Sequence, residues 1–108
     1  MAVKVEVPDL EPFADKLEKN LKEVISKGAL EIEARAKAKC PVDTGNLRNS
    51  IHTEIKDDGK SAEVGTAVEY GAYVEFGTIH QPPHPFLIPS GNEVWNARIK
   101  PALHNIGG

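Results

Sequence analysis

The 108-residue chain has a single cysteine and no surplus of positive charge. Cys40 cannot form an intramolecular disulfide, so nothing in the cysteine content requires an oxidising compartment, and we expect folding in a cytoplasm. The 13 basic and 16 acidic residues give a formal net charge of -3. A protein that binds the phosphate backbone of a nucleic acid needs a basic surface. Sequence-specific nucleic-acid binding is therefore not expected.

Long apolar runs are also missing. Residues 1–7 alternate apolar side chains with polar or charged ones, a pattern that fits neither a signal peptide nor a membrane span. The length matches that of one average domain, so residues 1–108 are expected to form a single domain.

Apolar residues recur at helical spacing from Leu10 to Lys39, which predicts one long amphipathic helix. Asp9 is the expected N-cap, and Gly28 is a point where the helix could bend or break. Such a helix of about 30 residues would be about 45 Å long, whereas a domain of this size has a radius of gyration of about 13 Å. If the helix stays straight at Gly28, its apolar stripe is expected to contact a neighbouring subunit, with Leu21, Ile25 and Ile32 as candidate interface residues.

A turn is predicted directly after this helix. The proline that follows Cys40 ends the helix, because a residue before proline is pushed out of the α region. Asp43 and Thr44 can accept hydrogen bonds from the amides that follow them, and Gly45 frees the backbone. Leu47 is expected in a short helical turn, so these residues form a turn and packing motif.

A β-hairpin and a second helix are expected next. Residues 51–56 alternate in polarity, as do residues 62–66, which predicts two strands with one buried face. Residues 57–60, with the sequence DDGK, supply the turn between them. Residues 68–76 are expected to form a short helix ended by Gly77.

Prolines dominate the following stretch. They exclude helix and central strand from Thr78 to Pro85 and predict an extended, exposed arm. Residues 85–89 are expected to form a short third strand, followed by a helix that starts at Ser90 and kinks or ends at Pro101. The predicted fold is therefore α+β, with a long N-terminal helix packed on a small antiparallel sheet, a short middle helix and a C-terminal helix.

Residues with catalytic chemistry are scarce. Asp43-Thr44-Gly45 is the triplet of aspartic proteases, and a retroviral-type homodimeric protease has a similar size. Its mechanism needs paired carboxylates on loops after buried strands, whereas this triplet follows a predicted helix, so the turn is preferred and the protease is kept as an alternative. His80 and His84 have the spacing of helical metal ligands, but the prolines between them exclude that helix. No catalytic residue, metal or cofactor is expected.

Core packing is the expected role of most aromatic residues, and an interface role is the alternative. These residues are Tyr70, Tyr73, Phe76, Phe86 and Trp95. Tyr73, Phe76 and Phe86, together with Gly77, complete the turn and packing motif.

Four phrases occur in order along the chain: PVDTGNLRNSI at 41–51, VGT at 64–66, YGAYVEFGT at 70–78 and PFLIP at 85–89. Together with the charged amphipathic helix before them, they resemble the tail-completion, or head-tail joining, family of long-tailed bacteriophages and prophages. The resemblance implies a small α+β virion protein without enzymatic activity. It also implies assembly as a ring in the phage neck, between the head connector and the tail tube.

The partners implied by this resemblance are other copies of the chain, the phage connector, and the tail terminator or tube proteins. DNA would pass through the channel of such a ring, and no membrane is involved. The implied location is the virion neck, after synthesis in the host cytoplasm. Exposed arms suit pairing with a neighbour, so the candidate contacts of the arm are Gln81, Pro82, Pro83 and His84. A generic protein-interaction module is a further alternative.

Overall fold

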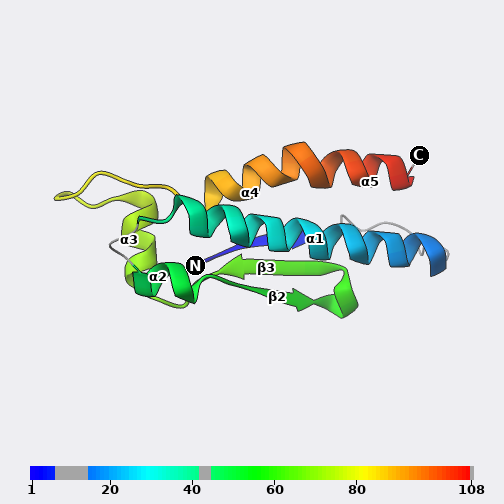
Figure 1. The fold of residues 1–108 in the computed structure, drawn as a ribbon, viewed down its shortest axis with the longest axis horizontal. Helices are drawn as coiled ribbons and strands as arrows, with labels where there is room; N and C mark the ends of the chain where they lie inside the picture. The colour runs from blue at the N-terminus through cyan, green and yellow to red at the C-terminus, as the bar shows by residue number, and fades with distance from the viewer. Residues whose placement is uncertain (7–14, 42–44, 108) are drawn as a thin grey trace.

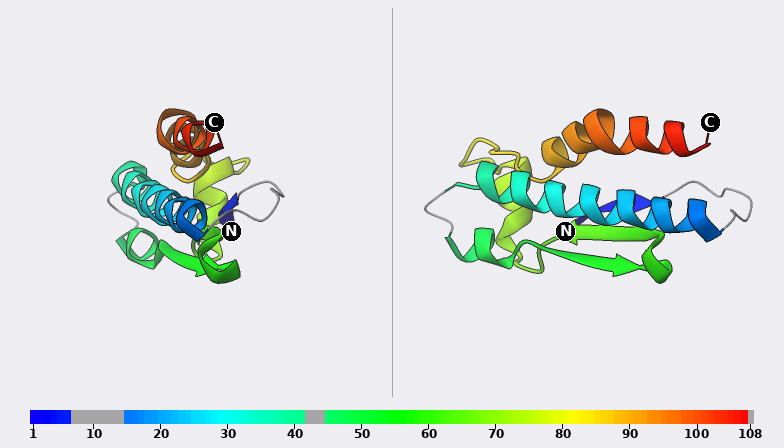
Figure 2. Two further views of the ribbon diagram at one scale, coloured as in Figure 1. Left: turned by 90° about the vertical axis from the view of Figure 1, so that its right-hand side faces the viewer. Right: turned by 45° about the vertical axis from the view of Figure 1, so that its right-hand side comes forward.

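The computed structural model describes residues 1–6, 15–41 and 45–107. It shows an elongated α+β fold with principal extents of 51 × 22 × 20 Å, and the predicted fold class is confirmed. Three layers lie side by side, namely a sheet, the long helix α1 and a C-terminal helical segment (Figure 1 and Figure 2). Helix α1 is the middle layer, so the sheet covers it on one side and the C-terminal segment covers it on the other.

Helix α1 (Asp15–Lys39) is the predicted long helix. The expected cap at Asp9 and start at Leu10 lie outside the described residues. Gly28 does not break the helix, contrary to one reading of the sequence. A Cβ atom built on Gly28 would lie 2.6 Å from Cδ1 of Ile99. The absence of a side chain therefore allows the C-terminal segment to approach α1 closely.

The sheet is antiparallel, with strand order β1-β3-β2 in the described part of the chain. Strands β2 (His52–Lys56) and β3 (Ser61–Gly65) form the predicted hairpin. Its buried face carries Ala62 and Val64, which are fully buried. The third strand is β1 (Ala2–Glu6), which pairs with β3.

Residues 85–89 do not form the expected third strand. They lead into helix α4 (Ile88–Val94), with Pro89 in its first turn, where a missing amide hydrogen is tolerated. Ser90, the expected cap, lies inside this helix and donates its hydroxyl to the carbonyl oxygen of Phe86 at 2.6 Å. A short apolar run between prolines fits either a buried strand or the start of a buried helix.

The C-terminal segment continues through η3 (Trp95–Ile99) into α5 (Lys100–Gly107). Of the two expectations for Pro101, a kink or a helix end, the helix end is wrong, because Pro101 lies in the first turn of α5. In η3 the backbone forms a wider π-type turn, and the amide of Lys100 donates to the carbonyl oxygen of Trp95. Proline has no amide hydrogen and cannot donate the usual bond to the carbonyl oxygen four residues earlier in a helix. The π-type turn changes the hydrogen-bond pattern just before Pro101, so this missing bond is tolerated.

Ion pairs join α1 to the C-terminal segment. Arg35 contacts Glu31 at 3.0 Å and Glu93 at 3.1 Å, while Lys39 contacts Glu93 at 2.9 Å. Arg98 approaches Glu31 at 3.5 Å. The bond from Lys39, followed by that from Arg35, lowers the pKa of the Glu93 carboxyl. The contacts of Glu93 with Arg35 and Lys39, and of Arg98 with Glu31, connect α1 to the C-terminal segment, whereas the Arg35–Glu31 pair lies within α1.

Two short helices lie at the end of the molecule where α1 finishes (Figure 1). Helix α2 (Gly45–Ser50) buries Leu47 completely, as the sequence predicts. Helix α3 (Tyr70–Phe76) ends at Gly77, also as predicted. The turn expected of Asp43 and Thr44 lies outside the described residues.

Candidate interaction surface

One face of α3 is lined with exposed aromatic side chains. Tyr70, Tyr73 and Phe76 follow one another at intervals of three residues, which places them along one side of the helix. Tyr73 is 61% exposed and Phe76 is 62% exposed. The expectation that these residues pack in the core is therefore wrong, whereas Phe86 is fully buried as predicted. Exposed aromatic side chains grouped on one face favour the interface role.

The predicted arm follows α3 directly. Residues 78–85 are all exposed, and the arm projects from the end of the molecule beyond α3 (Figure 1). Gly77 has a φ of 77°, and a Cβ atom at this position would lie 2.8 Å from the backbone nitrogen of Pro83. Only glycine fits here, because the chain both adopts a left-handed conformation and returns close to itself.

Hydrogen bonds shape the tip and the base of the arm. Thr78 and Gln81 exchange backbone bonds of 2.9 and 3.3 Å, and the Thr78 hydroxyl accepts bonds from the amides of His80 and Gln81. At the base, the amide of His84 donates to the carbonyl oxygen of Val74 at 2.7 Å. The arm is thus a closed loop with a defined turn, and Ile79 at its tip is 95% exposed.

Glu75 fixes the arm to the rest of the fold. Its side chain is almost completely buried, and its carboxylate accepts hydrogen bonds from the amides of Phe86, Leu87 and Ile88 at 3.1, 2.8 and 3.2 Å. These amides precede and begin α4, where helical amides have no partner within the helix. One carboxylate therefore joins the two ends of the arm, the first through α3 and the second through α4.

The interface role expected of the α1 stripe is not compatible with the structure. Leu21, Ile25 and Ile32 are 2%, 0% and 0% exposed. Ile25 and Ile32 belong to the hydrophobic core cluster of this same chain, and Leu21 is also buried. Their side chains are therefore unavailable to a neighbouring subunit unless the fold opens.

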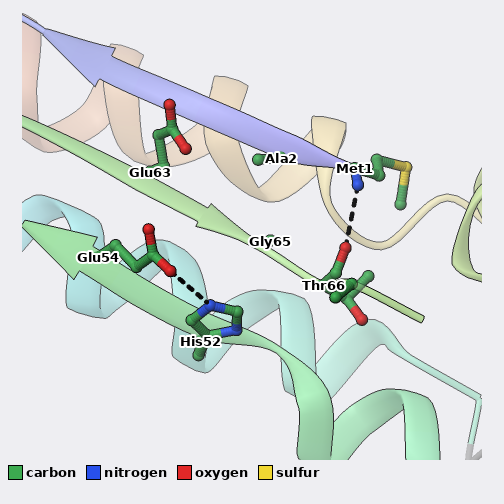
Figure 3. Close-up of a pocket in the computed structure, with 8 residues that line it drawn as sticks. Met1, Ala2, His52, Glu54, Glu63, Gly65 and Thr66 are labelled. Atoms are coloured by element: carbon green, nitrogen blue, oxygen red, sulfur yellow. Dashed lines mark hydrogen bonds and ion pairs between the residues drawn. The ribbon is translucent and has the colours of Figure 1, made fainter.

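A pocket of about 260 Å³ lies on the outer face of the sheet (Figure 3). His52 and Glu54 line it from β2, and their side chains approach each other at 3.3 Å. The Met1 amino group donates to the Thr66 carbonyl oxygen at 3.0 Å on the opposite side. His52 also contacts the Ser50 carbonyl oxygen through Nδ1 at 3.0 Å. Both ring nitrogens can donate only when the imidazole is protonated.

These contacts predict a pH effect. The Ser50 carbonyl and then the Glu54 carboxylate raise the pKa of His52. Protonated His52 therefore stabilises the fold at low pH, and this contribution is lost as the pH rises through the raised pKa. When the pH is raised from about 6 to about 8, we expect the free energy of unfolding of the natural chain to fall, and that of His52→Asn to fall less. The difference between the two falls should be less than about 1 kcal/mol. Urea unfolding at several pH values measures this, and equal pH slopes would contradict it.

The described residues contain no group of three or more His, Cys, Asp or Glu side chains that could hold a metal ion. His80 and His84 lie on the exposed arm, and the Asp43-Thr44 part of the protease-like triplet lies outside the described residues. No helix in the described ranges is both long and apolar enough to cross a membrane. The most prominent surface features are thus the arm and the aromatic face beside it.

Together these features define a small α+β protein with a projecting arm and an exposed aromatic face. Residues 8–77, more than half of the chain, match the family described as "Bacteriophage HK97-gp10, putative tail-component". The chain belongs to this family of HK97 gp10-like phage tail components, which gives it a structural role in a phage tail. No curated protein and no solved structure matches it.

Sequence reasoning missed Glu75 and Ile79. Glu75 lies four residues after Gly71, a buried position on the inner face of α3. A carboxylate on an inner helical face needs specific partners, but the sequence alone indicates the opposite face, which carries the aromatic side chains, as the inner one. Ile79 lies within the arm that the prolines predict to be exposed, but it was not named among the candidate contact residues.

Proposed function

We propose that this chain is a tail-completion component of the phage neck that joins the head connector to the tail as part of a ring. The observation that supports this proposal most strongly is the match of residues 8–77 to a family of phage tail components. The exposed arm and aromatic face support it, because a protein that works by assembly needs surfaces for its neighbours.

The ring contacts are assigned to the outer surface of α1 and to the hairpin. The apolar stripe of α1 is already used in the core, so only the outer side of the helix is available. Strand β2 pairs with β3 and with no other described strand. An edge strand of this kind offers backbone groups to a neighbouring chain.

The arm is assigned to a neighbouring neck protein other than this chain. Residues 78–85 are exposed, yet the base of the arm is held by Glu75 and His84. A preorganised loop loses little conformational entropy on binding. The contact residues would be Gln81, Pro82, Pro83 and His84.

The arm can be tested by replacing residues 81–84 with Gly-Ser-Gly-Ser in the phage that carries the gene. We expect a chain that folds normally but gives lysates with filled heads and unjoined tails, with infectious titre reduced by more than about 100-fold, as for loss of an interface hot spot. Circular dichroism of the purified variant checks the fold, and electron microscopy of lysates checks joining. A normal titre from a folded variant would remove this role from the arm.

A further inference from the structure

The part of the arm that returns from its tip toward α4 carries three prolines in four residues. This returning limb is residues 82–85, with the sequence PPHP, and it is exposed along its whole length (Figure 1). Proline fixes its own φ at about −65° and holds the residue before it in an extended conformation. Each residue of the limb is a proline or precedes one, and the limb lies in neither a helix nor a strand. These restrictions favour the polyproline II conformation.

Pro82 and Pro85 have the spacing of a polyproline II ligand. This helix has three residues per turn and rises about 3.1 Å per residue, so the two rings lie on one side of the limb, about 9 Å apart. A pair of prolines separated by two residues is the pattern that aromatic-lined grooves bind. The pattern is short, so the polar groups of the limb must decide between this mode of recognition and others.

The backbone of the limb offers acceptors and no free donor. Its prolines have no amide hydrogen, and the amide of His84 already donates to the carbonyl oxygen of Val74 at 2.7 Å. Within the described part of the chain, the carbonyl oxygens of residues 82–85 accept no hydrogen bond. Pairing with a β-strand needs backbone donors as well as acceptors, so strand addition does not suit this limb. A partner must instead supply donors, such as the N–H of tryptophan or the O–H of tyrosine.

Charge does not select the partner of the arm. No Asp, Glu, Lys or Arg occurs from residue 76 to residue 92. The carboxylate of Glu75 is buried, and it accepts bonds from the amides at the start of α4. A strongly charged partner surface, or a phosphate backbone, therefore meets no opposite charge on the arm. Recognition is left to the proline rings and the carbonyl oxygens.

We propose that the returning limb docks as a polyproline II segment in an aromatic-lined groove on a neighbouring neck protein. This inference rests on the proposed function, and it names the chemistry of the partner that the arm contacts. Aromatic side chains of the groove pack against the rings of Pro82 and Pro85, while their N–H or O–H groups donate to the carbonyl oxygens of the limb. Because Glu75 and the bond between His84 and Val74 hold the base of the arm, the limb loses little conformational entropy on docking.

A single arm should bind weakly, because one turn of polyproline II buries far less area than a stable interface. In the proposed ring each copy presents one arm. Docking of the first arm raises the effective concentration of the others, so the whole ring binds much more tightly than one copy. The contact thus favours the assembled ring over free copies.

A second copy of this chain also offers exposed aromatic side chains. Tyr73 and Phe76 lie on one face of α3 and are 61% and 62% exposed. They project from the convex surface of a helix, whereas a polyproline II segment is bound in a groove. A different neck protein is therefore the preferred partner, and docking on a second copy is an outcome that the experiment can detect.

The double variant Pro82→Ala/Pro85→Ala removes the two rings and keeps the length and the anchors of the arm. Its binding is measured by isothermal titration calorimetry with the purified head connector, tail terminator and tail tube proteins of the same phage. We expect the natural chain to bind one of them, and the double variant to bind it more than about 10-fold more weakly, as for loss of an interface anchor. Pro89→Ala makes the same change in the first turn of α4 and should bind as the natural chain does. Circular dichroism checks that each variant folds.

Hydroxyl-radical footprinting of the same complex identifies the groove. Tryptophan or tyrosine side chains of the bound neck protein should be protected by the natural chain and not by the double variant. Replacing a protected aromatic residue with alanine should weaken binding by a similar factor. The double variant should then lose little further affinity for this altered partner, because both changes remove the same contact.

Four outcomes would overturn the proposal. They are equal binding by the natural chain and the double variant, protection that includes no aromatic residue of the partner, and binding to none of the three proteins up to about 1 mM. The fourth is protection of Tyr73 and Phe76 in this chain, which would assign the arm to a second copy.

Phage titres separate this inference from the proposed function. If the Gly-Ser-Gly-Ser replacement of residues 81–84 blocks joining while phage with the double variant keep a natural titre, the arm retains its role in the neck. Only docking through the proline rings is then contradicted. A natural titre with both changes contradicts the role of the arm as well.

Discussion

Glu75→Ala should lower the free energy of unfolding by about 3 to 5 kcal/mol, because it leaves buried amide donors without an acceptor. The carboxylate accepts bonds from three successive amides at 2.8 to 3.2 Å. Phe86 and Leu87 are fully buried, so water cannot readily replace the lost acceptor at their amides. Urea unfolding followed by circular dichroism measures the change.

Glu75→Gln is the matched control for this prediction. Glutamine has nearly the same volume and keeps one acceptor oxygen, but it loses the charge and brings donor hydrogens toward the amides. We expect it to be less destabilising than alanine. The alanine variant should also be cleaved faster in residues 78–85 by a nonspecific protease, since the base of the arm loses its anchor. A stability loss below about 1 kcal/mol for alanine would contradict the anchoring role.

Much of the fold could be predicted from local patterns in the sequence. Apolar spacing gave α1, alternation on both sides of residues 57–60 gave the hairpin, and Gly77 marked the end of α3. Strand β1 was missed although residues 1–7 alternate, because its partner β3 lies about sixty residues further along the chain. Such long-range pairing leaves no local signature.

The candidate surface was harder to predict, for a related reason. Helical spacing shows which face of α1 is apolar, but it does not show what covers that face. Ile25 and Ile32 are covered by the same chain, so the expected partner for the stripe was wrong. Tyr73 and Phe76 were assigned to the core although they are exposed. Aromatic residues on a short helix have the same spacing whether they face a core or an interface.

Gly28→Leu should lower the free energy of unfolding by about 3 kcal/mol, because the added side chain has no space between α1 and the C-terminal segment. Even a Cβ atom at this position would lie 2.6 Å from both Cδ1 and Cγ1 of Ile99, which is fully buried. The preference of leucine for helical conformation offsets only about 1 kcal/mol of this strain. Thermal or urea unfolding measures the difference.

Ile99→Ala provides the decisive comparison, since it alone should cost about 2 to 5 kcal/mol through the cavity that it creates. Combined with Gly28→Leu, it should cost about 0.5 to 3 kcal/mol less than the sum of the two single changes, because the new leucine can fill that cavity. Gly45→Leu is the matched control, as a Cβ atom at Gly45 meets no atom within 4 Å. Additive losses in the double variant would show that Gly28 and Ile99 do not share one packing site, and the close approach of the two helical layers would then need another cause.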